Sequence, residues 1–254
     1  MIAQSSFHSN IFMRVKMDKY NSWNDYWNKE NPEFDEVMGL TTEVFYENFR
    51  KRYPHTSADV LLDYGCGPGV LIQLLKDDCK KIIGIDASSI YVEKCKHLFQ
   101  NESNVSVQQI TGFHDLIELL SSEDINQVIT LSVIQYFRSL DQLTEYLDIF
   151  RLSAQKKRRA VRVLIADIIP LRHRMLMDFI EILFDAVKRK YLFRYLKFIA
   201  KYLKETVINR RERKLQVDYP FFEQYASSYN LTICKINGLT NHKNRYSVEI
   251  LFTP

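Results

Sequence analysis

Short apolar runs alternate with helical patterns through the middle of the chain. The segments after each run repeat apolar residues at three- and four-residue spacing, which is typical of amphipathic helices. The runs predict strands at Val60–Asp63, Lys81–Asp86, Asn104–Ile110, Ile125–Leu131 and Ala160–Ile168. The intervening patterns predict helices at 70–76, 88–99, 116–120 and 140–152. This alternation favours a parallel sheet with helices on both faces.

The two ends of the chain depart from the alternation. Leu231–Ile236 and Tyr246–Phe252 are strand-like runs without a helical pattern between them, and Asn237-Gly238 is a turn signal after the first. We expect them to pair antiparallel. The predicted fold is thus α/β, with a doubly wound, mostly parallel seven-stranded sheet and an antiparallel C-terminal edge strand. Residues 1–254 are expected to form a single domain.

Residues 1–52 are expected to form an N-terminal arm and helical cap. Residues 41–52 should be helical, with Thr41 or Thr42 as the N-cap. Tyr20, Trp23 and Trp27 recur on one helical face. This helix either packs its aromatic face on the core or forms a lid over a ligand site, and the pattern leaves both open.

A glycine-rich turn follows the first predicted strand. Asp63 ends the strand, and glycine then recurs at every second position, at Gly65, Gly67 and Gly69. Glycine allows positive φ and a close approach of backbone to ligand. Asp86 ends the second strand about 20 residues later, where Rossmann-like sites carry a ribose-binding carboxylate. There is no Gly-Lys-Ser/Thr, and the third glycine of a dinucleotide GxGxxG is missing.

These features together resemble class I S-adenosylmethionine (SAM)-dependent methyltransferases. The resemblance covers roughly residues 41–170 and the final strand pair. Four segments carry it: Leu62-Asp63-Tyr64-Gly65-Cys66-Gly67-Pro68-Gly69, Ile83-Gly84-Ile85-Asp86-Ala87-Ser88, the fourth strand with its turn at 126–137, and the fifth strand at 163–170. It implies an enzyme, with SAM as cofactor.

The resemblance also implies roles for particular residues. Asp63 would help hold the ammonium end of SAM, and Asp86 would accept hydrogen bonds from the ribose hydroxyls. The expected cofactor-binding residues are Asp63, Gly65, Cys66, Gly67, Gly69, Asp86, Ala87, Thr111, Gly112, Phe113 and Ser132. The expected acceptor-binding residues are Tyr20, Trp23, Trp27, Gln135 and Tyr136, although ordinary packing explains Gln135 and Tyr136 equally well. No acid follows the third strand until Asp115, so the adenine contact would come from Thr111 or from backbone.

Methyl transfer needs a general base only when the acceptor must lose a proton. His173 follows the fifth strand and is the candidate base; the alternative is a partly exposed histidine in a basic stretch. His114 is expected at the surface or on the adenine side, and His242 in a solvent-facing loop. No HxxxH, CxxC or carboxylate cluster with ligand spacing is present, so no metal site is expected.

A basic helical insert at 171–218 separates the fifth strand from the last strand pair. Residues 171–215 hold 13 Lys/Arg and 5 Asp/Glu, in a chain whose net charge is +4. Two apolar stripes run along it, at 176–187 and 192–203, and cations lie opposite the second. Three interpretations remain: a substrate cap with a solvated polar face, peripheral contact with an anionic membrane through 186–204, or binding of an anionic acceptor.

The acceptor class is narrowed by missing motifs. Neither the Asn/Asp-Pro-Pro-Tyr/Phe motif nor the Pro-Cys motif of DNA methyltransferases is present, so no DNA partner is expected. We expect O- or N-methylation of a small molecule or glycan precursor. The alternatives are a membrane-surface methyltransferase of a lipid-linked acceptor and a non-catalytic SAM-fold binding or scaffold subunit. Scattered cysteines and the lack of a signal peptide or long apolar run suggest a cytoplasmic protein, peripheral at the inner membrane surface if the insert binds lipid.

Overall fold

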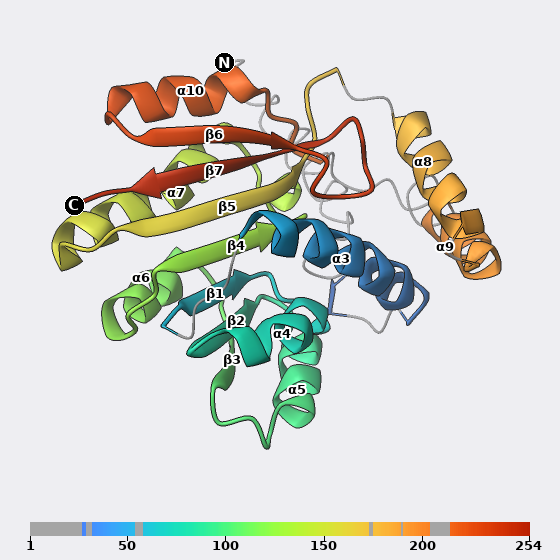
Figure 1. Cartoon of the computed structure of the whole chain (residues 1–254), viewed down its shortest axis with the longest axis horizontal. Coiled ribbons are helices and arrows are strands. Elements are labelled where there is room, and N and C mark those ends of the chain that lie inside the picture. The colour runs from blue at the N-terminus through green and yellow to red at the C-terminus, as the bar shows by residue number, and fades with distance from the viewer. Residues whose placement is uncertain (1–26, 29–31, 54–57, 173–174, 189, 204–213) are drawn as a thin grey trace, which may run out of the picture.

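A mixed seven-stranded sheet organises the computed structural model, which describes residues 27–28, 32–53, 58–172, 175–188, 190–203 and 214–254 (Figure 1). The strands are β1 Val60–Tyr64, β2 Lys81–Asp86, β3 Val105–Gln109, β4 Gln127–Leu131, β5 Val161–Ile168, β6 Thr232–Asn237 and β7 Tyr246–Phe252. Their order is β3-β2-β1-β4-β5-β7-β6. The first five are parallel, and β7 runs antiparallel to both β5 and β6. The predicted fold class is confirmed.

Helices cover both faces of this sheet. They are α3 Pro32–Arg52, α4 Val70–Leu75, α5 Ser89–Leu98, α6 Phe113–Ser122, α7 Leu140–Lys157 and α10 Tyr219–Ser228. α8 Met175–Lys188 and α9 Leu192–Leu203 lie to the side, packed on α3. Short 3-10 turns lie at Lys76–Asp78 and Ile134–Tyr136. Serine hydroxyls cap two of the helices: Ser88 accepts from the Tyr91 amide before α5, and Ser139 from the Gln142 amide before α7.

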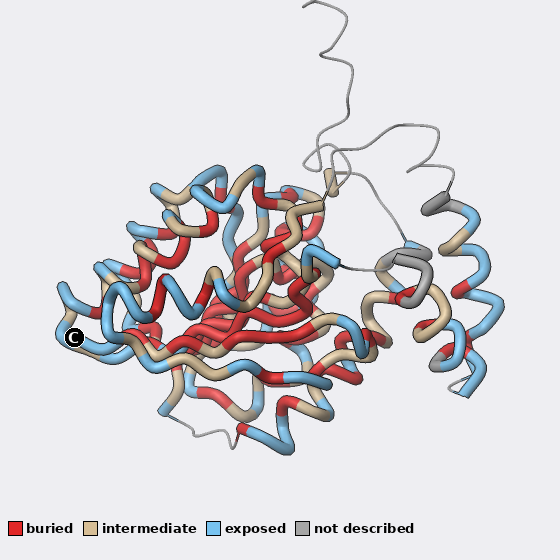
Figure 2. The backbone as a smooth tube through the Cα atoms, turned by 90° about the horizontal axis from the view of Figure 1, so that it is seen from above, coloured by how far each residue is buried: buried red, intermediate tan, exposed pale blue. Residues whose placement is uncertain are grey.

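Two apolar cores lie on opposite faces of the sheet. One joins α3, α4 and α5 to the sheet through side chains such as Phe45, Ile72 and Cys95. The other joins α6, α7 and α10 through side chains such as Leu116 and Phe222. Buried residues accordingly concentrate along the strands (Figure 2). Coverage on both faces explains why the central strands read as continuous apolar runs rather than alternating ones.

Two helices differ from the sequence-based expectation. α3 begins at Pro32, and the prediction of Thr41 or Thr42 as its N-cap is wrong. Both hydroxyls instead donate to the Met38 carbonyl oxygen within the helix, at 2.9 and 2.8 Å. The sequence pattern does not predict α10; its proline lies in the first turn, where a missing amide hydrogen costs no intrahelical hydrogen bond.

The basic insert forms a hairpin of α8 and α9 at the side of the molecule (Figure 1, Figure 2). Its inner face packs on α3 through Val37, Ile182, Ala186, Tyr191 and Tyr195. The predicted apolar stripes are only partly buried, because the buried face of α8 is centred on positions 182 and 186. The apolar residues left exposed are Leu183, Phe184, Val187, Leu192, Phe193 and Leu196. Among the described residues, we find no helix both long and apolar enough to span a membrane.

Candidate active site

A cavity of about 500 Å³ lies at the carboxyl ends of β1, β2 and β4. Parallel strands place these ends at one edge of the sheet, which is where open α/β folds bind ligands. Many of the residues that the sequence singled out line the cavity. They are Trp27, Asp63, Gly65, Cys66, Gly67, Asp86, Ala87, Thr111, Ser132 and Tyr136.

The glycine turn presents backbone to this cavity. Gly65 and Gly67 have φ values of 79° and 49°, in the region that favours glycine. A Cβ on Gly65 would overlap a Val133 methyl carbon, whereas one on Gly67 would meet no heavy atom within 4 Å. Gly65 is therefore needed for close packing beneath the turn, and Gly67 leaves open space.

Asp86 is held in place by backbone donors. The Gly67 amide donates to its Oδ2 and the Ser88 amide to its Oδ1, both at 2.8 Å. Burial raises the pKa of Asp86, and the backbone hydrogen bonds oppose that shift. The carboxylate thus has a fixed orientation at the cavity wall and further lone pairs with which to accept hydrogen bonds.

Asp63 is the most unusual electrostatic feature of the site. It is 3% exposed, and its buried Oδ2 has no hydrogen-bond partner. Burial, followed by the charge of Asp86, raises the pKa of Asp63 to about 7. A buried carboxylate without a partner is costly, so the site favours a ligand that brings a positive charge next to Asp63. The residues present therefore fit the ammonium end of SAM.

The end of β3 forms another wall of the cavity. Gln109, Ile110 and Thr111 line the cavity there. The Asp115 carboxylate accepts hydrogen bonds from both the amide and the hydroxyl of Thr111, at 2.6 and 2.9 Å. The first acid after β3 therefore orients Thr111, which is the residue expected beside the adenine.

Aromatic side chains meet at the cavity edge. The rings of Trp27 and Tyr136 pack edge to face with centroids 5.5 Å apart. The Lys214 ammonium lies 5.7 Å from the Tyr136 ring centroid, and the Leu215 amide donates to the Gln135 carbonyl oxygen at 2.8 Å. Segments far apart in sequence, at 27, 136 and 214, are thus brought together beside the cavity.

Several predicted site residues do not line the cavity. Gly69 packs beneath the turn, where a Cβ would meet Phe99 at 2.8 Å. Gly112 precedes α6, and Phe113 packs on Phe137 and Tyr146 in the core. The Gln135 side chain is buried and donates to the Ser132 carbonyl oxygen. Tyr20, Trp23 and His173 lie outside the described residues.

The structure adds residues that the sequence pattern did not indicate. Additional lining residues include Asn28, Met38, Thr42, Tyr91, Gln109, Arg138 and Gln142. The α3 residues could not be found from local pattern, because only packing brings that helix to the cavity. Ser132 and Asp167 have positive φ values of 58° and 67° at the ends of β4 and β5. The Ser132 hydroxyl donates to Asp167 at 2.7 Å, so Asp167 helps to hold Ser132 in its strained conformation at the cavity wall.

His242 corrects another expectation. It is 9% exposed rather than solvent-facing, because the loop between β6 and β7 folds against α8. There it lies close to Asp178 and Glu181, which no sequence spacing connected to it.

Comparison with known proteins agrees with this geometry. A family model described as a methyltransferase domain matches residues 55–176. Over this segment the chain is similar to methyltransferase domains. The matched residues include β1 to β5, the glycine turn and both Asp63 and Asp86, so the resemblance identified from these motifs is confirmed.

Known relatives of this methyltransferase domain are distant. A Schizosaccharomyces pombe protein described as an uncharacterized methyltransferase is 37% identical over 81 residues, or 30% of this chain. The chain spans only 28% of that relative's length. Among solved structures, DhpI in complex with SAH matches with a TM-score of 0.54 at 10% identity, covering 91% of this chain and 94% of that one. A cyclopropane-fatty-acyl-phospholipid synthase-like protein from Lactobacillus casei matches with a TM-score of 0.54 at 14% identity, covering 91% and 98%. At these identities the structural matches establish a shared fold.

Proposed function

We propose that this chain is an enzyme that uses SAM to methylate oxygen or nitrogen of a small molecule or glycan precursor. The observation that carries the proposal is the carboxylate pair at the glycine turn. Asp63 lacks a partner for its buried Oδ2, and Asp86 is fixed by two amides at the same cavity. SAM offers an ammonium group and a ribose diol, the two groups that such carboxylates bind.

The chain's own residues would divide the task of binding. Asp63 holds the ammonium group, Asp86 accepts from the ribose hydroxyls, and Gly67 leaves room for the ligand beside its backbone. Thr111, oriented by Asp115, contacts the adenine. When bound, SAM supplies a methyl group already activated by a sulfonium. The remaining work of the protein is to align the acceptor and exclude water.

The aromatic edge of the cavity supports a compact acceptor. Trp27 and Tyr136 contact each other there, and the end of the insert lies beside them. Flat apolar rings suit the face of a sugar or aromatic acceptor and exclude water from it. We propose His173 as the general base and Tyr20 and Trp23 as acceptor contacts. These three roles are proposed from the sequence.

SAM binding tests the cofactor assignment. Isothermal titration should give one SAM site per chain. Asp86→Ala should weaken binding by about 1–3 kcal/mol, because it removes charge-assisted hydrogen bonds. Glu93→Ala, on the exposed face of α5, is the matched control and should leave the affinity unchanged. Unchanged affinity in Asp86→Ala would reject the ribose assignment.

Methyl transfer tests the enzyme assignment separately. Labelled SAM should pass its methyl group to a component of a small-molecule extract. The rival hypothesis, a non-catalytic binding or scaffold subunit, requires SAM binding without any labelled product. Product formed only on a protein or nucleic acid would reject the small-molecule acceptor.

A second candidate function places the enzyme at an anionic membrane surface. Phe184 and Phe193 on the hairpin are 72% and 70% exposed, and Lys188, Lys190 and Lys197 beside them are exposed cations. No acidic residue occurs from 186 to 204. Exposed aromatics among lysines favour insertion into an anionic interface.

Liposome sedimentation tests this surface. The protein should bind vesicles containing phosphatidylserine at low salt and ignore pure phosphatidylcholine vesicles. The double substitution Phe184→Ser and Phe193→Ser should abolish binding, whereas Leu98→Ser, at an exposed apolar residue elsewhere, should not. If the double variant and Leu98→Ser lost vesicle binding to the same extent, the hairpin would be rejected as the membrane contact.

A further inference from the structure

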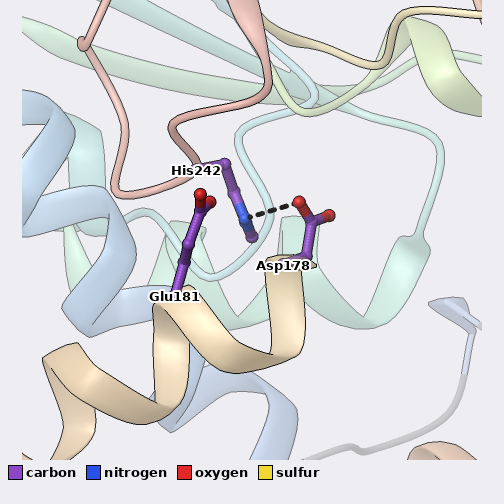
Figure 3. Close-up of side chains that lie close together, drawn as sticks. All are labelled: Asp178, Glu181 and His242. Atoms are coloured by element: carbon purple, nitrogen blue, oxygen red, sulfur yellow. Dashed lines mark ion pairs between the residues drawn. The ribbon is translucent and has the colours of Figure 1, made fainter. Parts of the chain in front are cut away.

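Three side chains with metal-binding atoms converge where the insert meets the sheet. Asp178 and Glu181 lie one turn apart on α8, and His242 comes from the loop between β6 and β7 (Figure 3). One ligand atom from each can be chosen so that all lie within 4.8 Å of one another. The imidazole lies between the two carboxylates in Figure 3. None of the three lines the SAM cavity.

Neighbouring groups orient the two carboxylates. Arg245 binds Asp178 through Oδ2, and the Oδ1 atom faces His242. Glu181 accepts from the Lys243 amide at 2.8 Å and from the Asn244 amide group at 3.3 Å. Hydrogen bonds of this kind around metal-binding carboxylates fix the ligand orientation. The cluster is thus held in place from both α8 and the loop.

The imidazole of His242 gives independent support, because its buried Nδ1 makes no hydrogen bond. The residue as a whole is 9% exposed. Asp178 Oδ1 lies 3.5 Å from Nδ1; this ion-pair contact, dashed in Figure 3, is longer than a normal hydrogen bond between these atoms. Two ligands bound to one tetrahedral zinc at about 2.0–2.2 Å are about 3.4 Å apart. The separation therefore fits an ion held between them.

Carboxylates gather at this junction. Arg245 pairs with Asp167 and Asp178, and Glu181 lies close to Asp178 and His242. A divalent cation between Asp178 and Glu181 would be attracted by both carboxylates.

We propose that Asp178, Glu181 and His242 bind one divalent transition-metal ion such as Zn²⁺. The donor set is Asp178 Oδ1, one carboxylate oxygen of Glu181 and His242 Nδ1, with water completing the coordination. Glu181 is only partly buried, so its side chain can rotate the short distance needed to close the site. The ion would cross-link α8 to the β6–β7 loop and thereby anchor the insert to the sheet.

Metal binding to the full chain tests this proposal independently of methyl transfer. After dialysis against EDTA, titration with Zn²⁺ at pH 7.5 should show one site per chain, and Zn²⁺ should raise the melting temperature. Mg²⁺ at the same concentration should bind far more weakly, because imidazole prefers the transition metals.

Two variants at the site and one elsewhere locate the binding. His242→Ala should lower the Zn²⁺ affinity at least tenfold. Glu181→Gln should do the same, and it keeps an oxygen acceptor for the Lys243 amide if His242→Ala fails to fold. His114→Ala removes an exposed histidine that pairs with Glu118 at 3.0 Å, and it should leave the affinity unchanged. The proposal is overturned if the wild-type chain takes up no stoichiometric Zn²⁺, or if the folded site variants bind it as tightly as wild type.

Discussion

Replacing Asp63 with asparagine should stabilise the protein without ligand at alkaline pH. The pKa of this carboxyl is about 7 in the folded chain, against an ordinary value of 3.8. Because the folded value is the higher one, the folded state holds a proton that the unfolded state loses between these two pH values. The stability associated with that proton is fully present below about pH 4 and is lost as pH rises through 7.

The magnitude follows from the size of the shift. The rise from 3.8 to about 7 is about 3 pKa units, and each unit corresponds to about 1.36 kcal/mol. Ionised Asp63 therefore costs the folded protein at most about 4 kcal/mol at pH 8. An asparagine side chain is neutral and has nearly the same shape. Asp63→Asn should therefore be more stable than wild type at pH 8 and nearly equal at pH 4.

Urea denaturation at pH 4, 6 and 8 measures this difference. Asp77→Asn is the matched control, because its side chain is 87% exposed and should show no comparable pH trend. With SAM present at pH 8, wild type should become more stable than Asp63→Asn. The ammonium group would stabilise ionised Asp63 but not an amide. A difference between Asp63→Asn and wild type that stays constant from pH 4 to pH 8 would refute the reasoning.

Substitutions at Gly65, Gly67 and Trp27 test the turn and the cavity edge. Gly65→Ala should lower the free energy of unfolding by about 2–4 kcal/mol, since its Cβ would strike Val133 and its φ is 79°. A Cβ in Gly67→Ala would meet no heavy atom within 4 Å, so this variant should lose only about 1–2 kcal/mol of unfolding free energy through backbone strain. Equal losses of unfolding free energy in the two variants, measured by urea denaturation, would contradict the packing argument. Trp27→Ala should raise the acceptor KM severalfold at saturating SAM, because it removes the ring that packs on Tyr136. Trp27→Phe keeps an aromatic ring, so its acceptor KM should stay close to that of wild type. A change in kcat alone would contradict that role.

The strands and the glycine turn were readable because their signals are local. β1 is buried along its whole length and β2 along most of its length, so each reads as an uninterrupted apolar run ending in an acid. The start of α3 and the whole of α10 were missed, because short or weakly amphipathic helices gain their stability from packing rather than from a strong local pattern.

In the basic insert, the periodicity of apolar residues predicts the helices but not which of their residues are buried. The apolar stripes of α8 and α9 predicted a buried face, and the helices do form. Periodicity alone does not say which part of a wide apolar stripe meets a neighbour. The position of α3 decided that Ile182 and Ala186 are buried while Phe184 and Val187 are exposed.

By itself the sequence determined the fold class, the resemblance to methyltransferases and the carboxylates at the glycine turn. These follow from residues close in sequence, whose spacing is constrained by the strand, the turn and the helix that they form. Only the tertiary structure decided that Trp27 meets Tyr136, that the pKa of Asp63 is raised, and that His242 is buried beside Asp178. The physical reason is that burial and charge proximity depend on residues far apart in the chain, and no local pattern encodes those distances.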